Sequence, residues 1–197
     1  MGWPGQGLLF IWVAWLLSWL LASGWTARTA TQQSPASRIV ESVPVWSGAF
    51  LIAITPRGVL AAPLYGQRAW TEWSMLALTA AGFGLTWWAR IHLGRFWSAA
   101  VGLKVDHVLV RSGPYGITRH PIYTGLLLAV IATALARDSL AGLMGAGCIW
   151  FGLTLKLRHE ETVLGARFGP DYAAYKSEVP ALIPRLRRRT AMTPGRS

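Results

Sequence analysis

The sequence predicts an all-α integral membrane protein with about five transmembrane helices. Hydrophobic residues make up 53% of the 197 residues and charged residues only 14%, which is more apolar than an ordinary soluble domain. The 12 tryptophans point the same way, because Trp is enriched at membrane interfaces. The net charge of +11 is compatible with a nucleic-acid partner. The basic residues, however, lie in loops and in the C-terminal tail beside apolar runs, so we expect cytoplasmic loops and no nucleic acid.

Three apolar runs precede the middle of the chain. Residues 7–25 are long enough to cross a hydrocarbon core of roughly 30 Å. A secretory signal would normally carry basic residues before its apolar run, and none precedes this one, so we expect a membrane span. A polar loop over 26–42 should follow. Residues 43–64 form a weaker span that Thr55-Pro56-Arg57-Gly58 should kink or end early. Residues 70–91 form a clearer third span, in which Ala80, Ala81, Gly82 and Gly84 allow close helix approach.

The second half of the chain begins with a polar connection over 92–118, with a short extended segment at 105–110. Residues 122–136 then form an apolar helix, Arg137-Asp138-Ser139 a tight turn, and 140–157 the last span. Gly142, Gly145 and Gly147 spell G-x-x-G-x-G, but they follow no strand, so they are interpreted as helix-packing glycines rather than a dinucleotide site. The single cysteine, Cys148, lies in this span, so neither a disulfide framework nor a metal site is expected.

The stretch from Gly113 to Gly125 combines turn signals, charge and a helix start. Gly-Pro cannot continue a helix, whereas Pro121 suits a first helical turn, so a new helix should begin near His120. A helix start exposes unpaired N–H groups and binds carboxylates or phosphates readily. The alternative is an interface anchor, in which Arg119 and Tyr123 only mark the headgroup level.

Lys and Arg concentrate between Arg90 and Arg119 and from Lys156 onward. Basic loops stay in the cytoplasm, which predicts a multi-pass inner-membrane protein with its N-terminus outside and its C-terminus in the cytoplasm.

Several short motifs follow one another in the order typical of the isoprenylcysteine carboxyl methyltransferase family, and the sequence resembles that family. Phospholipid N-methyltransferases carry related patterns. The match covers roughly residues 93–184. Its motifs are His107-x-Leu109-Val110, Gly113-Pro114-Tyr115, Arg119-His120-Pro121-x-Tyr123-x-Gly125, Glu160-Glu161, Phe168-Gly169-x-x-Tyr172-x-x-Tyr175 and Val179-Pro180.

The resemblance implies a helical membrane enzyme that uses S-adenosyl-L-methionine, with helical membrane segments over 1–91, a methyltransferase core over 92–184 and a basic tail over 185–197. The positions that match the family's cofactor contacts are His107, Val108, Leu109, Val110, Tyr115, His120, Pro121, Ile122, Tyr123 and Glu160. Catalytic or acceptor-binding roles are expected for Arg119, Lys156 and Glu161.

One position departs from the family. Lys156 stands where the isoprenylcysteine enzymes carry an Arg thought to meet the substrate carboxylate. Lys cannot form the bidentate fork of Arg, although Arg158 could substitute for it. Tyr172 and Tyr175 are interpreted as packing residues and kept out of the site.

The expected reaction is methyl transfer to a carboxylate or another nucleophilic head of an apolar, membrane-embedded acceptor. A carboxylate or thiolate needs no general base, whereas an amine must be neutral when it attacks, and Glu161 or His120 could then take a proton. The alternatives are a phospholipid or small-molecule N- or S-methyltransferase, an NADPH-dependent membrane reductase, and a non-enzymatic membrane scaffold. A scaffold would leave the polar residues gathered at one junction unexplained.

Overall fold

The structure, a computed structural model, describes residues 3–28, 33–54, 56–66, 68–98, 100–102, 106 and 108–184. Over this part of the chain the fold is all-helical, without a strand, as the sequence predicts. The α-helices are α1 (Trp3–Leu21), α2 (Pro35–Ala53), α3 (Ala69–Leu93), α4 (Pro121–Ala136), α5 (Leu140–Phe168) and α6 (Pro170–Glu178). The 3₁₀ turns are η1 (Ala22–Gly24), η2 (Gly58–Ala61), η3 (Gly94–Phe96) and η4 (Gly113–Gly116). Predicted residue His107 and the basic tail 185–197 lie outside the described residues.

Helix α2 differs most from the prediction. It begins at Pro35, inside the expected polar loop, because the Ser34 side chain accepts a hydrogen bond from Ser37 N at 3.2 Å and Pro35 suits the first helical position. It ends at Ala53, shortly before Pro56, as expected for a span that ends early, so the prediction is wrong at the start of the helix and not at its interruption. The helix starts early because its capped first turn outweighs the loop-like character of the charged residues Arg38 and Glu41. Pro56 prevents the helix from continuing further.

Helices α4 and α5 form the predicted hairpin. Pro121 opens α4, and the Ser139 side chain caps α5 by accepting from Gly142 N at 3.2 Å. In the turn, Asp138 has φ 43° and its carboxylate accepts the N–H groups of Leu64 and Tyr65 at 2.8 and 3.1 Å. These bonds dock the connection after α2 on the hairpin turn, at the end of the bundle away from the site.

Helix α5 continues well beyond the expected end at 157. No proline interrupts the chain between Leu140 and Phe168, and Gly169, with φ 51°, ends the helix just before Pro170 starts α6. The polar segment 158–168 is therefore an extension of α5. This extension carries the Glu160–Glu161 pair on a rigid element.

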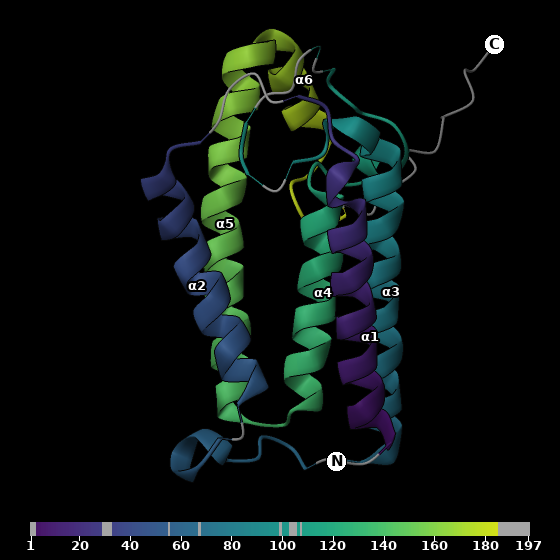
Figure 1. Cartoon of the computed structure of the whole chain (residues 1–197), viewed down its shortest axis with the longest axis vertical. Helices are drawn as coiled ribbons and strands as arrows, with labels where there is room; N and C mark the ends of the chain where they lie inside the picture. Colours follow the sequence, from purple (N-terminus) through teal and green to yellow (C-terminus); the bar gives the residue numbers. More distant parts are fainter. Residues whose placement is uncertain are drawn as a thin grey trace, which may run out of the picture.

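The helices pack in a spatial order that differs from the chain order. Helix α1 packs on α3, α3 on α4, α4 on α5 and α5 on α2. Figure 1 shows α2 beside α5 on one side of the molecule and α1, α3 and α4 on the other. Glycines permit two of these contacts. A Cβ on Gly82 of α3 would lie 2.5 Å from Gly125 O of α4, and one on Gly145 of α5 would lie 2.6 Å from Gly48 O of α2. Gly84 and Gly147, expected to pack in the same way, face open space.

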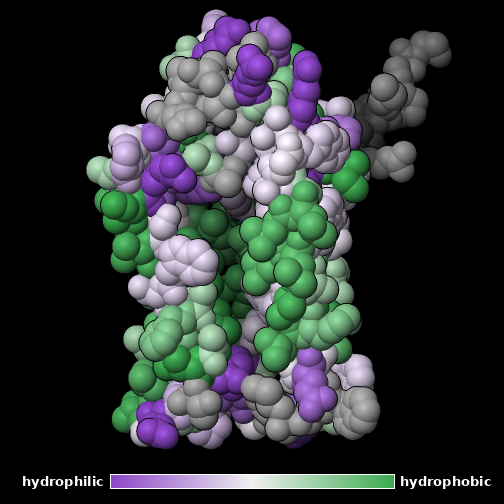
Figure 2. All heavy atoms as spheres, viewed as in Figure 1, coloured by the Kyte–Doolittle hydropathy of each residue, from purple (hydrophilic) through white to green (hydrophobic). Residues whose placement is uncertain are grey.

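Large apolar side chains remain exposed along the outer helices, for example Phe10 at 72% and Trp46 at 73%. Figure 2 shows that hydrophobic residues cover the middle of the molecule, while hydrophilic residues gather at its two ends. Two stretches, Gly5–Gly24 and Leu140–Phe168, are long and apolar enough to cross a membrane, and α4 is a shorter apolar helix. An apolar belt of this kind fits a hydrocarbon surrounding. The arrangement in five spans stays a prediction.

The glycine contact between α3 and α4 leads to a stability prediction. We expect Gly82→Ala to lower the free energy of unfolding by about 1 to 3 kcal/mol, because the added Cβ must push α3 away from the Gly125 carbonyl. Thermal unfolding in detergent measures it. Gly84→Ala is the matched control, since its Cβ would meet open space, and equal melting temperatures for the two variants would contradict the packing argument.

Candidate functional site

The site begins with the turn η4, which follows the end of α3. Gly113 has φ 59°, and a Cβ there would lie 2.6 Å from the ring of His92, so only glycine fits. The turn buries Tyr115, whose ring stacks on His92 with 6.3 Å between the ring centroids. Tyr175 of α6 donates its hydroxyl hydrogen to Tyr115 O at 2.6 Å. The Gly-Pro-Tyr motif is therefore fixed from both α3 and α6.

The start of α4 is held by the chain segment that follows α6. Arg119 N donates to Pro180 O at 2.8 Å, and His120 N donates to Ala181 O at 3.0 Å. Thr124 Oγ1 donates to Leu182 O at 2.8 Å. The Val179-Pro180 motif, whose purpose the sequence does not reveal, thus pairs with the backbone at the helix start.

Side chains from α4 and α5 meet at the two adjacent carboxylates. Tyr123 donates a short hydrogen bond to Glu160 Oε1, and His120 Nδ1 lies 3.5 Å from Glu160 Oε2. The other ring nitrogen, His120 Nε2, lies 3.4 Å from Glu161 Oε1. His120 is buried and bridges both carboxylates. Its ring is parallel to that of Tyr123, with 5.6 Å between centroids.

Glu161 is the centre of an ion-pair network. Arg119 approaches its Oε1 with Nε at 3.0 Å and Nη2 at 2.5 Å, and Lys176 of α6 approaches its Oε2 at 2.7 Å. Arg119 also donates to the carbonyls of Lys176 and Val179. Glu161 thereby ties together α4, α5 and α6.

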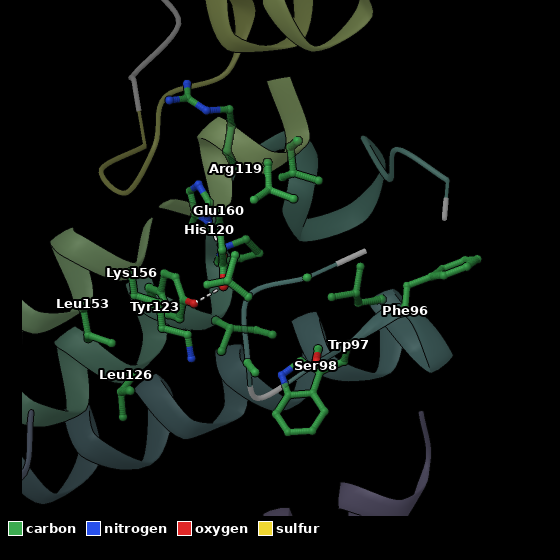
Figure 3. A pocket seen from close by; sticks show the side chains of 18 of the residues that line it. Phe96, Trp97, Ser98, Arg119, His120, Tyr123, Leu126, Leu153, Lys156 and Glu160 are labelled. Carbon is green, nitrogen blue, oxygen red and sulfur yellow. Dashed lines mark hydrogen bonds and ion pairs between the residues drawn. The ribbon is translucent and has the colours of Figure 1, made fainter. Parts of the chain in front are cut away.

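A cavity of about 560 Å³ lies beside this network. Every predicted cofactor residue that the structure describes contributes to its wall: Val108, Leu109, Val110, Tyr115, His120, Pro121, Ile122, Tyr123 and Glu160. Of the predicted catalytic residues, Arg119 and Lys156 line the cavity and Glu161 does not. Figure 3 shows Tyr123, Lys156 and Glu160 on one side of it and Trp97 and Ser98 on the other. The structure thus brings the predicted residues together, while their roles stay predictions.

Other wall residues were not predicted. Helix α1 contributes Trp15 and Trp19, and α2 contributes Glu41 and Trp46. Tyr172 and Tyr175, interpreted as packing residues, are buried but also line the cavity, because α6 folds back over α5. For α1, the repeated tryptophans were the only feature of the sequence that could have indicated a role in the cavity wall. Arg158, considered as a substitute for Lys156, is exposed and does not line the cavity.

The wall has the chemistry to hold a medium-sized ligand with both apolar and polar parts. Its volume falls within the usual range of small-molecule sites, roughly 300 to 1,000 Å³. Val108, Leu109 and Ile122 offer an apolar surface for a flat ring. Glu160 offers a carboxylate to hydroxyl or amino groups. The described part of the chain gathers no group of His, Cys, Asp and Glu that could hold a metal ion.

Comparisons with known proteins match part of the chain. Residues 75–166 match the sequence model described as "Isoprenylcysteine carboxyl methyltransferase (ICMT) family". The "Cobalt-zinc-cadmium resistance protein CzcN" of Cupriavidus metallidurans is 34% identical over 133 residues, 65% of this chain and 59% of that protein. The "Protein-S-isoprenylcysteine O-methyltransferase" of Schizosaccharomyces pombe is 31% identical over 99 residues, 49% of this chain and 42% of that protein. "Methanethiol S-methyltransferase 2" of Bradyrhizobium diazoefficiens is 42% identical over 84 residues, 39% of this chain and 29% of that protein. The chain therefore spans less than two thirds of the length of each of these relatives.

The bridge between the two carboxylates gives a pH prediction. Burial alone would lower the pKa of His120, but its contacts with Glu160 and Glu161 outweigh burial and raise the pKa above its usual value. A raised pKa means that protonated His120 stabilises the fold fully below about pH 6.5, and that this contribution is lost as the pH rises through the folded-state pKa. Besides the two carboxylates, Arg119 and Lys176 are the charged groups of this network.

We expect the melting temperature of the wild-type protein to exceed that of His120→Gln by more at pH 6 than at pH 9. Thermal unfolding of both proteins over this range measures the difference, and the two proteins share every other side chain, so the effects of the remaining groups cancel. A difference that is constant or grows with pH would contradict the bridge.

Proposed function

Residues 75–166 match the model of the isoprenylcysteine carboxyl methyltransferase family, and from this match we propose that the chain is an S-adenosyl-L-methionine-dependent methyltransferase acting on an apolar acceptor in the membrane. The observation that carries the proposal is the convergence of the motif residues on one cavity. They come from the connection before α4, from the start of α4 and from the extension of α5. Packing alone does not require these three segments to enclose 560 Å³ at the polar end of apolar helices.

The residues present fit S-adenosyl-L-methionine. Val108, Leu109 and Val110 would pack against its purine, and Glu160 would accept hydrogen bonds from its ribose hydroxyls or amino group. The start of α4, with protonated His120 beside it, suits a carboxylate. When bound, the cofactor supplies a methyl group activated by a sulfonium charge. The chain's own part is to position the two reactants and to exclude water, since an in-line displacement needs little else.

The acceptor would bind in the apolar half of the cavity. Trp15, Trp19 and Leu20 of α1 form one wall, and Val45 and Trp46 of α2 form another. These two helices belong to opposite sides of the molecule in Figure 1, and Figure 2 shows a hollow lined by hydrophobic residues between the two groups of helices. A lipidic tail could therefore remain in the bilayer while its head reaches the cofactor. Burying the tail in this half also supplies binding energy.

Two acceptor chemistries come from the printed names of the relatives. The yeast relative's name denotes a carboxyl acceptor, and the Bradyrhizobium relative's name denotes a thiol. A carboxylate is our first choice, with Lys156 as the cation that holds it. Lys156 lines the cavity with its Nζ 5.9 Å from the centroid of the Tyr123 ring.

We place the site at the cytoplasmic face, with five spans, the N-terminus outside and the C-terminus inside. The support is the positive-inside pattern of Lys and Arg around α3, α4 and the end of α5. The same end of the molecule holds the ion-pair network, which needs water-accessible surroundings rather than hydrocarbon.

Cofactor binding tests the proposal directly. We expect Glu160→Gln to weaken S-adenosylhomocysteine binding about tenfold to a hundredfold, because a charge-assisted contact is lost. Calorimetry on the detergent-purified protein measures it. Glu178→Gln, at an exposed position of α6 away from the cavity, removes the same charge and should bind like the wild type. Absence of binding by the wild type would sink the proposed function.

Acceptor binding is tested separately through Lys156. With a prenylated cysteine as the anionic acceptor, Lys156→Met should reduce turnover by more than tenfold and leave S-adenosylhomocysteine affinity within about twofold. Arg158→Met is the control, since Arg158 is exposed outside the cavity wall. Equal turnover by the wild type and Lys156→Met would remove Lys156 from the acceptor site.

A further inference from the structure

A second carboxylate, that of Glu41, lies in the cavity wall and takes no part in the network around Glu160 and Glu161. Glu41 is only 8% exposed and sits on α2, where Arg38 is the only other charged residue. Helix α2 lies outside the segment that matches the family. Burying a carboxylate is costly unless it is hydrogen-bonded, so its partners show how it is used.

Two side chains hold one oxygen of Glu41. Its Oε1 accepts a hydrogen bond from Gln33 Nε2 at 2.6 Å and lies 2.9 Å from His159 Nδ1 on α5. Gln33 is itself fixed, because its Oε1 accepts from Val101 N at 3.3 Å and its N donates to Val101 O at 3.1 Å. The carboxylate is therefore held in place by the helix α5 and by the connection that follows α3.

Glu41 lines the cavity, and the contacts described above all fall on its Oε1, not on its second oxygen, Oε2. Over the described residues, neither a hydrogen bond nor a Lys or Arg ion pair reaches Oε2. A carboxylate accepts about four hydrogen bonds, so Glu41 keeps accepting capacity toward a ligand. Three Lys and Arg residues share the cavity wall. Arg119 pairs with Glu161 and Lys156 acts electrostatically on Glu160, while Arg38 of α2 forms no ion pair with Glu41 over the described residues.

The surroundings of Glu41 also suit a cation. Trp19 of α1, Trp46 of α2 and Trp97 after η3 line the same cavity. Aromatic faces attract ammonium groups, and more strongly when water is excluded. A cavity wall that contains both a carboxylate and aromatic rings is thus suited to a nitrogen that carries hydrogen atoms and positive charge, although the Trp97 ring already has the Arg90 guanidinium 4.4 Å from its centroid.

We propose that Glu41, held by Gln33 and His159, binds an N–H-bearing head group of the acceptor, either an ammonium or a neutral amine. This rests on the proposed function, because it names a chemical feature of the molecule that enters the acceptor half of the same cavity. The nitrogen contacts Glu41 Oε2, while the apolar tail lies between α1 and α2. Glu41 is a specificity-determining residue here, and Lys156 remains the residue for an anionic group of the same head.

The test measures binding rather than turnover. Dodecylamine and dodecanol have equal chains and differ only in the head, so tryptophan fluorescence titration in the presence of saturating S-adenosylhomocysteine compares the heads alone. The wild-type protein should bind dodecylamine at least about tenfold more tightly than dodecanol, as expected for a charge-assisted contact. Glu41→Gln keeps the shape and should reduce that ratio to about one. Glu72→Gln, at the far end of α3 and outside the cavity wall, should keep the wild-type ratio.

Each outcome decides the matter. A wild-type ratio near one, or a ratio that Glu41→Gln leaves unchanged, overturns the proposal. If Glu41→Gln fails to fold, the wild-type ratio still decides, together with His159→Gln, which retains a donor near Glu41 and should preserve the preference. Loss of S-adenosylhomocysteine binding in the wild type would count against the proposed function instead, because the amine preference is also measurable without it.

Discussion

The contact on which the rest of the site depends is the side chain of His120 between two consecutive carboxylates of α5. Because each ring nitrogen meets a different carboxylate, the imidazole fixes both the height and the rotation of α4 against α5. Arg119 and Lys176 complete the charge balance around Glu161. Buried ions cost several kcal/mol each unless their partners are well placed, so the network favours one relative position of α4, α5 and α6. The cavity is the space that this position leaves open.

Arg90 plays the corresponding part at the other side of the cavity. It is fully buried on α3, and its guanidinium donates to the carbonyls of Ala22, Trp25 and Gly94, which follow the ends of α1 and α3. Its guanidinium carbon also lies 4.4 Å from the centroid of the Trp97 ring. One cation thus ties the segments after α1 and α3 together, in addition to the backbone hydrogen bonds that Ala22 O and Gly94 O accept, and holds an aromatic wall residue of the site.

The sequence predicted the elements that local chemistry determines. Pro121 marks the start of α4, the turn at 137–139 separates the hairpin helices, and the motif residues from Val108 to Glu160 line one cavity. It did not predict what depends on contacts between distant segments. Glu41 and Gln33 gave no signal, because their partner His159 lies on a helix that packs on α2 only in the folded chain.

The same distinction explains the errors. Helix α2 was expected to start at Val43 because Arg38 and Glu41 look like loop residues, yet both are helical and Glu41 is buried in a polar contact. Tyr172 and Tyr175 were expected only to pack, since a sequence does not show that α6 turns back over the cavity. Predictions failed where a polar residue was judged by its own character without its tertiary partners.

The two halves of the cavity have different origins, and this bears on how specificity arises. The half lined by η4, the start of α4 and the end of α5 lies within the family segment 75–166 and carries the residues expected to bind the cofactor. The other half is lined by α1 and α2, which lie before that segment. A cofactor has one structure, so its site tolerates little change, whereas acceptors differ in tail and head.

Because α1 contacts the remaining helices mainly through α3, and α2 mainly through α5, either helix can change its cavity-facing side chains without disturbing the network around His120. Under the proposed function, substrate choice would depend most on residues such as Trp19, Glu41 and Trp46, which the family resemblance does not describe.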